Sequence, residues 1–215
     1  MIVLGVTGAP AAGKSTVCAK LEKLGCPVID VDRLGHEALD EPAVRARIVA
    51  LFGDGILGED GLIDRPALGK CVFSDENAIG RLESIVHPAV RGLLKERLVH
   101  AATLAAAGAG PDVAVLECAL LFEGGLNQLC DIVLTVHAPR PTRLARAATR
   151  NWSDEELARR ESRQLSADEK RVRSNAVIDN DEGPEALDAA LDALLGHLST
   201  LTPSRPSGGT EGSSL

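Results

Sequence analysis

The chain has 215 residues, of which 45% are hydrophobic and 25% are charged, a balance that argues against a largely disordered or membrane-embedded protein. This length is typical of one α/β domain with inserted lobes rather than of two independent domains. The formal net charge of −8 disfavours general nucleic-acid binding, because such proteins bind phosphate backbones with surplus Lys and Arg. We therefore expect neither a nucleic-acid partner nor a membrane partner.

Cysteine usage and the first residues indicate a cytoplasmic protein. The five cysteines are odd in number and contain no Cys-x-x-Cys pair, which predicts reduced, mostly buried thiols rather than a disulfide framework or a zinc site. The opening residues MIVLGVTG have no basic start and are too short for the apolar region of a signal peptide. A cytoplasmic location is the resulting prediction.

Apolar runs alternate with helical patterns in the order expected of a parallel sheet with crossovers. The predicted strands lie at residues 2–6, 27–32, 112–121, 131–138 and 175–180. Their continuous apolar character is typical of strands that are buried on both faces. The first helix is expected directly after residue 13, since Val17, Leu21 and Leu24 repeat at helical spacing and Gly25 follows them.

Two long segments interrupt this alternation. Residues 33–110 are mainly helical in pattern and too long for a simple crossover, which predicts an inserted lobe. Residues 141–173, here called the lid segment, are densely charged, which predicts a solvated, mobile helical hairpin. Within it, Ser153 followed by Glu156 predicts a helix that begins with a capping box.

The expected organisation is one domain over residues 1–200 with a short tail. Its core comprises residues 1–32, 111–140 and 174–200, and the remaining parts are the lobe and the lid segment. Residues 201–215 are rich in Pro, Gly and Ser with little apolar content, which predicts a disordered tail.

The loop GAPAAGKST, residues 8–16, has the complete Gly-x-x-x-x-Gly-Lys-Ser frame between a predicted strand and a predicted helix. In this phosphate loop, successive backbone N–H groups point at one place near the positive end of the helix, which suits a phosphate. Gly8 allows a tight exit from the strand, Gly13 allows close approach of the anion, and Lys14 supplies a positive charge to the β and γ phosphates. The alternative is a small-residue turn that merely joins the strand to the helix.

The middle of the phosphate loop has alanine where flexible residues would be unsurprising. Main-chain amides bind the anion, so Ala9, Ala11 and Ala12 are acceptable wherever φ stays negative, and Pro10 loses only its own N–H. We expect the following residues to bind ATP, with the Ser15 hydroxyl also binding Mg²⁺: Gly8, Ala11, Ala12, Gly13, Lys14, Ser15 and Thr16.

A phosphate loop alone does not separate a GTPase, a mechanical ATPase and a small-molecule kinase. The chain contains no Asn-Lys-x-Asp tetrapeptide of the kind that binds guanine. The lid segment carries Arg143, Arg146 and Arg150, of which the last two are four residues apart and are expected to share a helix face. That face could neutralise transferring phosphates, since phosphoryl transfer depends mainly on charge stabilisation. The alternative is an ordinary solvated face.

Two carboxylates end the second predicted strand. Asp30 and Asp32 are two residues apart, so in an extended strand both point to one side, and Asp32 lies at the carboxyl end, where α/β sheets bind ligands. An acceptor hydroxyl needs an oxygen base there, and either carboxylate could serve Mg²⁺ through water. The alternative is that they cap the following helix. Glu117 follows the apolar residues 113–116 and could serve a water-bridged Mg²⁺, and the alternative is a strand-end carboxylate satisfied by the backbone.

Seven blocks of the sequence, in their order and spacing, resemble the dephospho-coenzyme A kinase family. The blocks are GVTGAPAAGKSTV, LGCPVIDVDRL, IDRPALGKCVF, HPAV, ALLFEGG, APRPTRLARAATR and NAVIDN. The resemblance covers residues 1 to about 195. It implies ATP-dependent phosphorylation of the ribose 3′-hydroxyl of dephospho-CoA, the last step of coenzyme A synthesis. It also implies a P-loop NTPase fold, with a central parallel five-stranded sheet flanked by helices, an inserted helical acceptor lobe and a helical lid.

The resemblance further implies roles for individual residues. Asp32 matches the proposed base, and Lys14 and Arg146 complete the expected catalytic set. Arg146 and Arg150 match lid arginines, while Asn180 matches a position near the adenine of ATP. Residues matched to acceptor binding are Asp32, Arg65, His87, Leu120, Leu121 and Glu123, with Leu68, Phe73 and Pro88 in the same blocks of the lobe. For His87 the alternative is a helix-start histidine held by packing beside Pro88.

The sequence departs from the family pattern at three places. The phosphate loop has Ala9, Pro10, Ala11 and Ala12 where the usual one reads Gly-Ile-Gly-Ser after its first glycine. Ala119 replaces a usual proline, and Ser174 with Asn175 replaces a usual Ala-Asp pair. We expect a stiffer loop and an altered acceptor affinity.

Two other functions remain compatible with the residues. One is another P-loop small-molecule kinase that acts on a nucleoside, a nucleotide or a shikimate-like alcohol, and the other is a nucleotide-hydrolysing switch. Nothing in the pattern predicts an oligomeric state.

Overall fold

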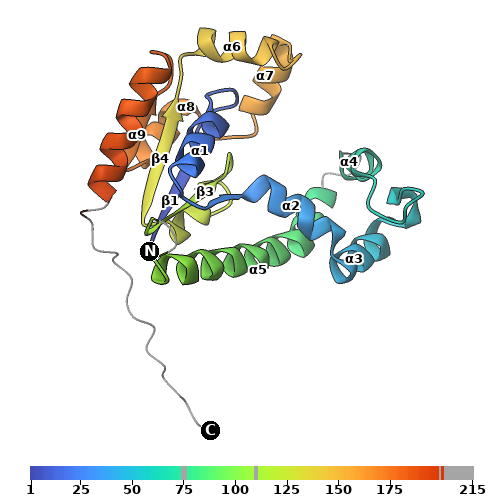
Figure 1. Cartoon of the computed structure of the whole chain (residues 1–215). Coiled ribbons are helices and arrows are strands. Elements are labelled where there is room, and N and C mark those ends of the chain that lie inside the picture. The colour runs from blue at the N-terminus through green and yellow to red at the C-terminus, as the bar shows by residue number, and fades with distance from the viewer. Residues whose placement is uncertain (74–76, 109–110, 199, 201–215) are drawn as a thin grey trace. The chain divides into compact units, whose positions relative to one another are not determined.

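Five strands form one sheet in the order β2-β3-β1-β4-β5 (Figure 1). The structure, a computed structural model of the chain, describes residues 1–73, 77–108, 111–198 and 200. The strands are β1 (Ile2–Thr7), β2 (Val28–Asp30), β3 (Val113–Glu117), β4 (Ile132–His137) and β5 (Ala176–Asp179). The pairs β1·β3, β1·β4 and β4·β5 are parallel, which confirms the predicted parallel α/β sheet.

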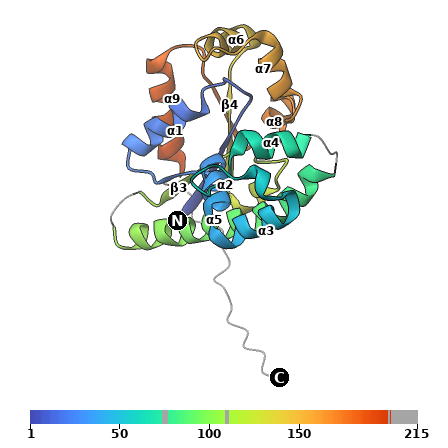
Figure 2. The same ribbon diagram turned by 90° about the vertical axis from the view of Figure 1, so that its right-hand side faces the viewer.

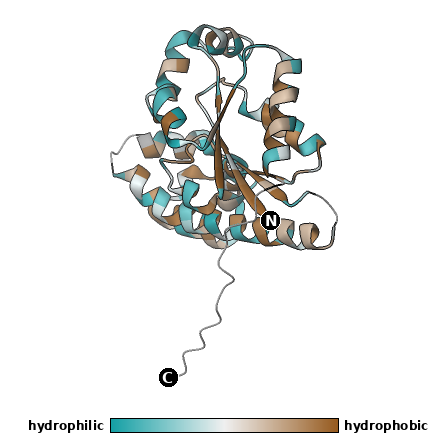
Figure 3. Cartoon of the chain, turned by 90° about the vertical axis from the view of Figure 1, so that its left-hand side faces the viewer, coloured by the Kyte–Doolittle hydropathy of each residue, from teal (hydrophilic) through white to brown (hydrophobic). Residues whose placement is uncertain are grey.

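The central strand β1 is buried along its whole length because it has a neighbour on each edge and helices on its faces. Its apolar side chains join those of β3, β4 and two helices, α1 (Lys14–Lys23) and α9 (Pro184–Leu198), in the main core. Hydrophobic residues concentrate on these strands (Figure 3). The core therefore fixes the strand end from which the phosphate loop emerges.

The described chain divides into two compact units. Unit 1 comprises Met1–Val28 together with the chain from Ala105 onward, and unit 2 comprises Ile29–Leu104. Besides β1, β3, β4, β5, α1 and α9, unit 1 contains η2 (Leu126–Leu129), α6 (Arg140–Ala148), α7 (Asp154–Glu161) and α8 (Ala167–Arg173), while the boundary between the units falls within β2. Helices α6 and α7 lie at the same end of the sheet as the phosphate loop (Figures 1 and 2).

Unit 2 is helical, as its sequence pattern predicts. It contains α2 (Val31–Asp40), α3 (Pro42–Phe52), η1 (Asp54–Ile56), α4 (Arg65–Phe73) and most of α5 (Ala78–Ala106). Its own core includes Val44 and Ile48 of α3, Ile56 of η1, Leu68 of α4 and Ile85 of α5. Unit 2 thus has a hydrophobic core separate from that of the sheet.

The structure corrects the second predicted strand. Strand β2 ends at Asp30 and helix α2 begins at Val31, so Asp30 and Asp32 do not lie on one extended strand. The physical reason is capping: the Asp30 side chain accepts a hydrogen bond from the backbone N–H of Arg33, which satisfies one open donor of the helix. The alternative interpretation, a carboxylate that caps the next helix, is therefore correct for Asp30.

The lid segment also differs from the predicted hairpin. It forms three helices, and because α6 ends at Ala148, Arg150 lies beyond it and does not share a helix face with Arg146. At the start of α7, Ser153 accepts from the Glu156 N–H as predicted, but the Glu156 carboxylate bonds Arg159 and Arg160 instead of completing the box.

The complete capping box lies one helix later. At the start of α8, the Ser166 hydroxyl accepts from the Glu169 N–H, and the Glu169 carboxylate accepts from the Ser166 N–H. These reciprocal bonds fix where α8 begins. The Ser166 hydroxyl also donates to the Glu169 carboxylate, and this bond, with that from the Ser166 N–H, holds the Glu169 pKa below its ordinary value. The predicted tail, residues 201–215, lies outside the described residues.

Candidate active site

The phosphate loop joins β1 to α1, and its residues Gly8–Gly13 are all buried. Both glycines are required by their neighbours. A Cβ atom added to Gly8 would lie 2.3 Å from the carbonyl oxygen of Val136 on β4, and one added to Gly13 would lie 2.1 Å from the Asn180 side-chain nitrogen. The loop is therefore packed tightly against β4 and the residue that follows β5.

Ala11 does not meet the condition on which alanine was expected to be tolerated, because its φ is +60°. That region is unfavourable for residues with a Cβ. The Ala11 methyl group lies in a small apolar cluster with Ala147 of α6 and Leu157 of α7, flanked by Leu144 and Trp152. Burial of the methyl group beneath the lid helices offsets part of the backbone cost.

Two side chains converge on the Ala12 carbonyl oxygen from different elements. The Arg146 guanidinium of α6 donates to this oxygen at 3.0 Å and to the Asn180 carbonyl oxygen at 2.6 Å. The buried Asn180 side chain donates to the same Ala12 oxygen at 2.9 Å. The structure thus brings together two predicted site residues, and both hold the phosphate loop. The role of Asn180 near adenine stays a prediction.

Arg143 has a structural role that the sequence did not separate from that of Arg146. It is buried, donates to the carbonyl oxygens of Ala138 at 3.1 Å and Pro10 at 3.4 Å, and pairs with Glu161 of α7. These contacts join α6, α7 and the phosphate loop. No feature of the sequence distinguishes this buried arginine from its exposed neighbours in the lid segment.

Arg150 is arranged differently from Arg146. It is exposed, and its guanidinium carbon lies 5.6 Å from the ring centroid of Trp152, while that of Arg160 lies 4.0 Å away. Such cation–π contacts orient an exposed guanidinium at modest energetic gain. Of the two predicted lid arginines, it is Arg146 that donates to the phosphate loop, at the Ala12 carbonyl oxygen.

Lys14, Ser15 and Thr16 form the first turn of α1, with Gly13 as the N-cap at a φ of +99°. The Lys14 ammonium donates to the Gly8 carbonyl oxygen at 3.2 Å, so it bends back along the loop. Ser15 and Thr16 are exposed at the helix N-terminus, where backbone N–H groups and the helix dipole favour an anion. These features suit an anion, and the assignment of these residues to ATP binding stays a prediction.

No three His, Cys, Asp or Glu side chains gather to hold a metal ion in the part of the chain that the structure describes. Magnesium in nucleotide sites is usually bound by one or two protein oxygens, waters and substrate phosphates, so such a cluster is not required. The exposed Ser15 hydroxyl beside Lys14 fits that pattern.

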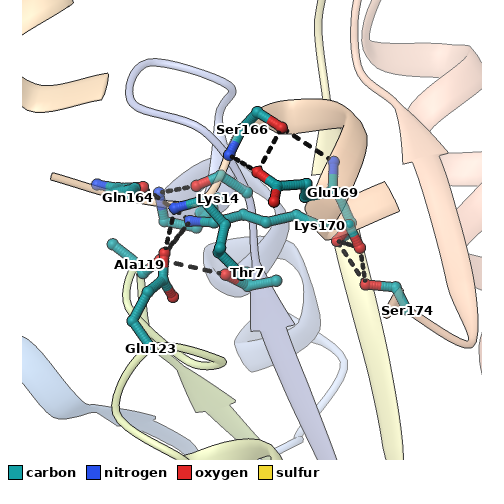
Figure 4. A network of polar contacts seen from close by, with 12 residues as sticks. Thr7, Lys14, Ala119, Glu123, Gln164, Ser166, Glu169, Lys170 and Ser174 are labelled. Carbon is teal, nitrogen blue, oxygen red and sulfur yellow. Dashed lines mark hydrogen bonds and ion pairs between the residues drawn. The ribbon is translucent and has the colours of Figure 1, made fainter. Parts of the chain in front are cut away.

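The segment of residues 119–123 follows β3 and Cys118. Leu120 is 41% exposed, whereas Leu121 is fully buried and packs beside Gly5 of β1. Contact of Leu121 with an acceptor would require the segment to move, and this assignment stays a prediction. The Glu123 carboxylate accepts from the Leu165 N–H at 2.6 Å and pairs with Lys170 of α8 (Figure 4).

Lys170 is the residue of this region that the sequence did not reveal. Its side chain is fully buried, and burial together with the charge of Lys14 lowers its pKa, against which Glu123 acts. It lies in a run of charged residues, where a buried lysine has no distinguishing pattern.

Two family departures have structural explanations. The Ala119 carbonyl oxygen accepts from Thr7 and Lys170, a role that alanine and proline fill equally because both have this oxygen. The Asn175 side chain accepts from the Val133 N–H at 2.8 Å, an acceptor role that aspartate also has, and the Ser174 hydroxyl bonds the Lys170 carbonyl oxygen at 2.8 Å.

The predicted acceptor residues of unit 2 lie on three helices. Asp32 is exposed in the first turn of α2, and Arg65 is exposed at the first position of α4. Leu68 is buried in the core of unit 2. His87 is exposed within α5, which continues through Pro88, so the alternative of a histidine at a helix start is wrong. The side chain of Phe73 lies outside the described part of the chain.

The cysteines are all free, as expected from their number and spacing. Cys18, Cys26 and Cys118 are buried, and Cys71 and Cys130 are partly buried. Burial, with smaller effects of Asp131 and Cys118, raises the pKa of Cys130 to about 12, so its thiol stays protonated at neutral pH. No described helix is both long enough and apolar enough to span a membrane.

The chain is similar to known proteins over most of its length. The family model described as "Dephospho-CoA kinase" matches residues 2–185. The chain belongs to the dephospho-CoA kinase family. Among relatives named dephospho-CoA kinase, that of Geobacter sulfurreducens is 41% identical over 196 residues, which cover 90% of this chain and 97% of the relative.

Solved structures agree with this membership of the dephospho-CoA kinase family. The crystal structure of TT1252 from Thermus thermophilus is 37% identical with a TM-score of 0.79, and the match covers 92% of this chain and 97% of that one. Dephospho-CoA kinase from Campylobacter jejuni is 26% identical with a TM-score of 0.68, over 92% and 96% of the two chains. The sequence resemblance and the P-loop kinase fold are thereby confirmed.

Proposed function

We propose that the chain transfers the γ-phosphoryl group of ATP to the ribose 3′-hydroxyl of dephospho-CoA, giving coenzyme A and ADP. The observation that carries the proposal is the family match over residues 2–185, a range that includes the phosphate loop, Asp32 and Arg146. The phosphate loop supports this proposal, because it leads directly into the N-terminus of α1, where Lys14 lies and where a phosphate is favoured.

On the donor side, we assign phosphate binding to the loop amides and to Lys14. Arg146 keeps the loop in shape through the Ala12 carbonyl oxygen and brings a positive charge from the lid segment. Positioned charge of this kind is the main protein contribution to phosphoryl transfer. Arg150 and Asn180 are assigned to nucleotide binding in the same proposal.

We assign magnesium binding to the Ser15 hydroxyl, with Glu117 at the end of β3 contributing through a water molecule. When bound, the ion would neutralise charge on the β and γ phosphates. Hydroxyl and carboxylate oxygens are suitable ligands for this hard cation.

On the acceptor side, we assign Asp32 as the base that accepts the proton of the 3′-hydroxyl group. Its exposed place in the first turn of α2 leaves the carboxylate accessible to a substrate. Arg65 and His87 are assigned to acceptor binding in unit 2, and Leu120, Leu121 and Glu123 in unit 1. The proposal includes neither a membrane partner nor a nucleic-acid partner. It assigns the chain to the cytoplasm.

The test is ADP release with Mg-ATP and one acceptor at a time: dephospho-CoA, adenosine, shikimate or none. We expect strong stimulation by dephospho-CoA alone, with coenzyme A identified as the product by mass spectrometry. An equal response to adenosine or shikimate would indicate a different small-molecule kinase. Release that is independent of any acceptor would indicate a nucleotide-hydrolysing switch.

A further inference from the structure

Lys170 is a lysine whose side chain has 0% exposure, although lysine is almost never fully buried unless it is paired. It lies on α8 in the lid segment, and the Ser166–Glu169 capping box fixes the start of that helix. The side chain points from α8 toward the segment 119–123 (Figure 4). Its burial therefore has to be explained by the partners of its ammonium group.

The Lys170 ammonium has three polar partners. It donates to the Ala119 carbonyl oxygen at 2.6 Å and to the Gln164 side-chain oxygen at 2.8 Å, and its Nζ lies 3.6 Å from a Glu123 carboxylate oxygen. A buried ammonium with two hydrogen bonds and a carboxylate nearby is compensated, and removal of the ammonium leaves Glu123 without this cation.

These partners link the lid segment to the start of the phosphate loop. The Ala119 oxygen that accepts from Lys170 also accepts from the hydroxyl of Thr7, the residue directly before Gly8. The Glu123 carboxylate in turn accepts from the backbone N–H of Leu165 in the lid segment. Through Ala119 and Thr7, the contacts of Lys170 therefore reach the residue that precedes the phosphate loop.

Charge gives these contacts a functional consequence. The ammonium of Lys14 is close enough to Lys170 to lower its pKa, while Glu123 acts in the opposite direction (Figure 4). Two cations and one carboxylate leave a net charge of +1, which favours a polyanion. Without Lys170 the same group is neutral, because the Glu123 carboxylate offsets the positive charge of Lys14, and the carboxylate repels a bound triphosphate.

We propose that Lys170 is a positioning residue of the donor site, which holds the Glu123 carboxylate so that its negative charge does not cancel the attraction of Lys14 for the triphosphate of ATP. The proposal relies on the proposed function for the identity of the donor nucleotide. Lys170 itself touches neither substrate, since its ammonium is occupied by protein partners.

The test is equilibrium binding of AMP, ADP and ATP, with Mg²⁺ and without acceptor, to the full chain and its variants. Lys170→Met is expected to weaken ATP binding about tenfold, with a smaller loss for ADP and the smallest for AMP, because charge repulsion grows with each phosphate. Lys170→Arg keeps the cation and is expected to retain most of the affinity. Arg173→Met, which removes an exposed cation from the same helix, is the matched control and is expected to change binding less than about twofold.

The deciding variant is Lys170→Met combined with Glu123→Gln. We expect the second substitution to restore most of the lost ATP affinity, because it removes the uncompensated carboxylate. A role of Lys170 in packing alone predicts no recovery, and an absence of recovery would overturn the proposal. Circular dichroism and thermal unfolding identify any variant that has lost its fold.

Glu123→Gln alone keeps the proposal testable even if Lys170→Met does not fold. It is nearly isosteric at a side chain that is 22% exposed, and it is expected to tighten ATP binding about twofold. Weaker ATP binding by this variant would contradict the proposal. If the wild-type chain failed to phosphorylate dephospho-CoA while these binding changes occurred, the proposed function would fail and the role of Lys170 would stand.

Discussion

The proposed donor site and the proposed acceptor residues of unit 2 are built in opposite ways. In unit 1, Gly8–Gly13 are buried, and their carbonyl oxygens accept hydrogen bonds from side chains of the lid segment and from Asn180. In unit 2, Asp32, Arg65 and His87 are exposed on three helices whose other faces form a local core. The first region is a network of hydrogen bonds, and the second presents exposed groups on a folded scaffold.

This difference determines what a substitution should do. In the donor region, removing one side chain leaves several partners unsatisfied, so binding, turnover and stability are expected to change together. On an exposed helix face, a substitution removes one chemical group with little effect on folding. Variants in the two regions are therefore expected to differ both in the size of the effect and in whether stability changes along with binding and turnover.

The largest effect is expected for Lys14→Ala in the donor region. The substitution removes the cation that would interact with the β and γ phosphates, and we expect kcat/KM for ATP to fall by about 10³-fold. Steady-state kinetics with dephospho-CoA as acceptor measure this loss, and Arg173→Met is the control for removal of a positive charge. Unchanged kinetics would refute the phosphate-site assignment.

The next largest effect is expected for Asp32→Asn in unit 2. The amide keeps the size of the side chain and the fold but cannot accept the hydroxyl proton, so turnover is expected to fall by about 10²-fold or more. ATP affinity and the free energy of unfolding are expected to stay near the wild-type values, as for an exposed residue. Near-normal turnover would show that Asp32 is not the base.

Arg146 and Arg150 provide a comparison inside the lid segment. Arg146→Met removes one hydrogen bond to the Ala12 carbonyl oxygen of the phosphate loop and one to the Asn180 carbonyl oxygen, and we expect ATP affinity to fall about tenfold. Arg150→Met removes an exposed guanidinium near Trp152 and is expected to change ATP affinity less than about threefold. Isothermal titration of both variants measures the difference, and equal losses would show that Arg150 contributes as much to ATP binding as Arg146 does.

The sequence predicted the fold and the strand–loop–helix geometry of the Gly-Lys-Ser frame well because both depend on local patterns. Continuous apolar runs placed the strands, although the third run extends four residues past the end of β3 at Glu117, and the Gly-Lys-Ser frame placed Lys14 and Ser15 at a helix start. The same use of local patterns gave a wrong result at Val31. The apolar run predicted a strand there, but the Asp30 side chain caps a helix that begins at Val31. Strand and helix starts compete over a few residues there, and one hydrogen bond decides between them.

The parts of the site that the sequence did not reveal depend on contacts between distant residues. Lys170 is 51 residues from Ala119, and Arg146 is 134 residues from Ala12. Neither spacing leaves a pattern, since charged residues of a lid have the same composition whether they face solvent or another element. Similarly, the positive φ of Ala11 follows from the packed loop and not from the residue type.

The smallest effect separates two alanines of the phosphate loop. Ala11→Gly relieves an unfavourable φ but removes a buried methyl group, so we expect the free energy of unfolding to change by less than about 1 kcal/mol. Ala12→Gly removes a fully buried methyl group without such relief, since Ala12 is not among the residues with positive φ, and should cost about 1.5 kcal/mol. Urea unfolding without nucleotide measures both. Equal losses would mean that the Ala11 backbone stores no strain, because the two substitutions remove the same methyl group and add the same chain flexibility.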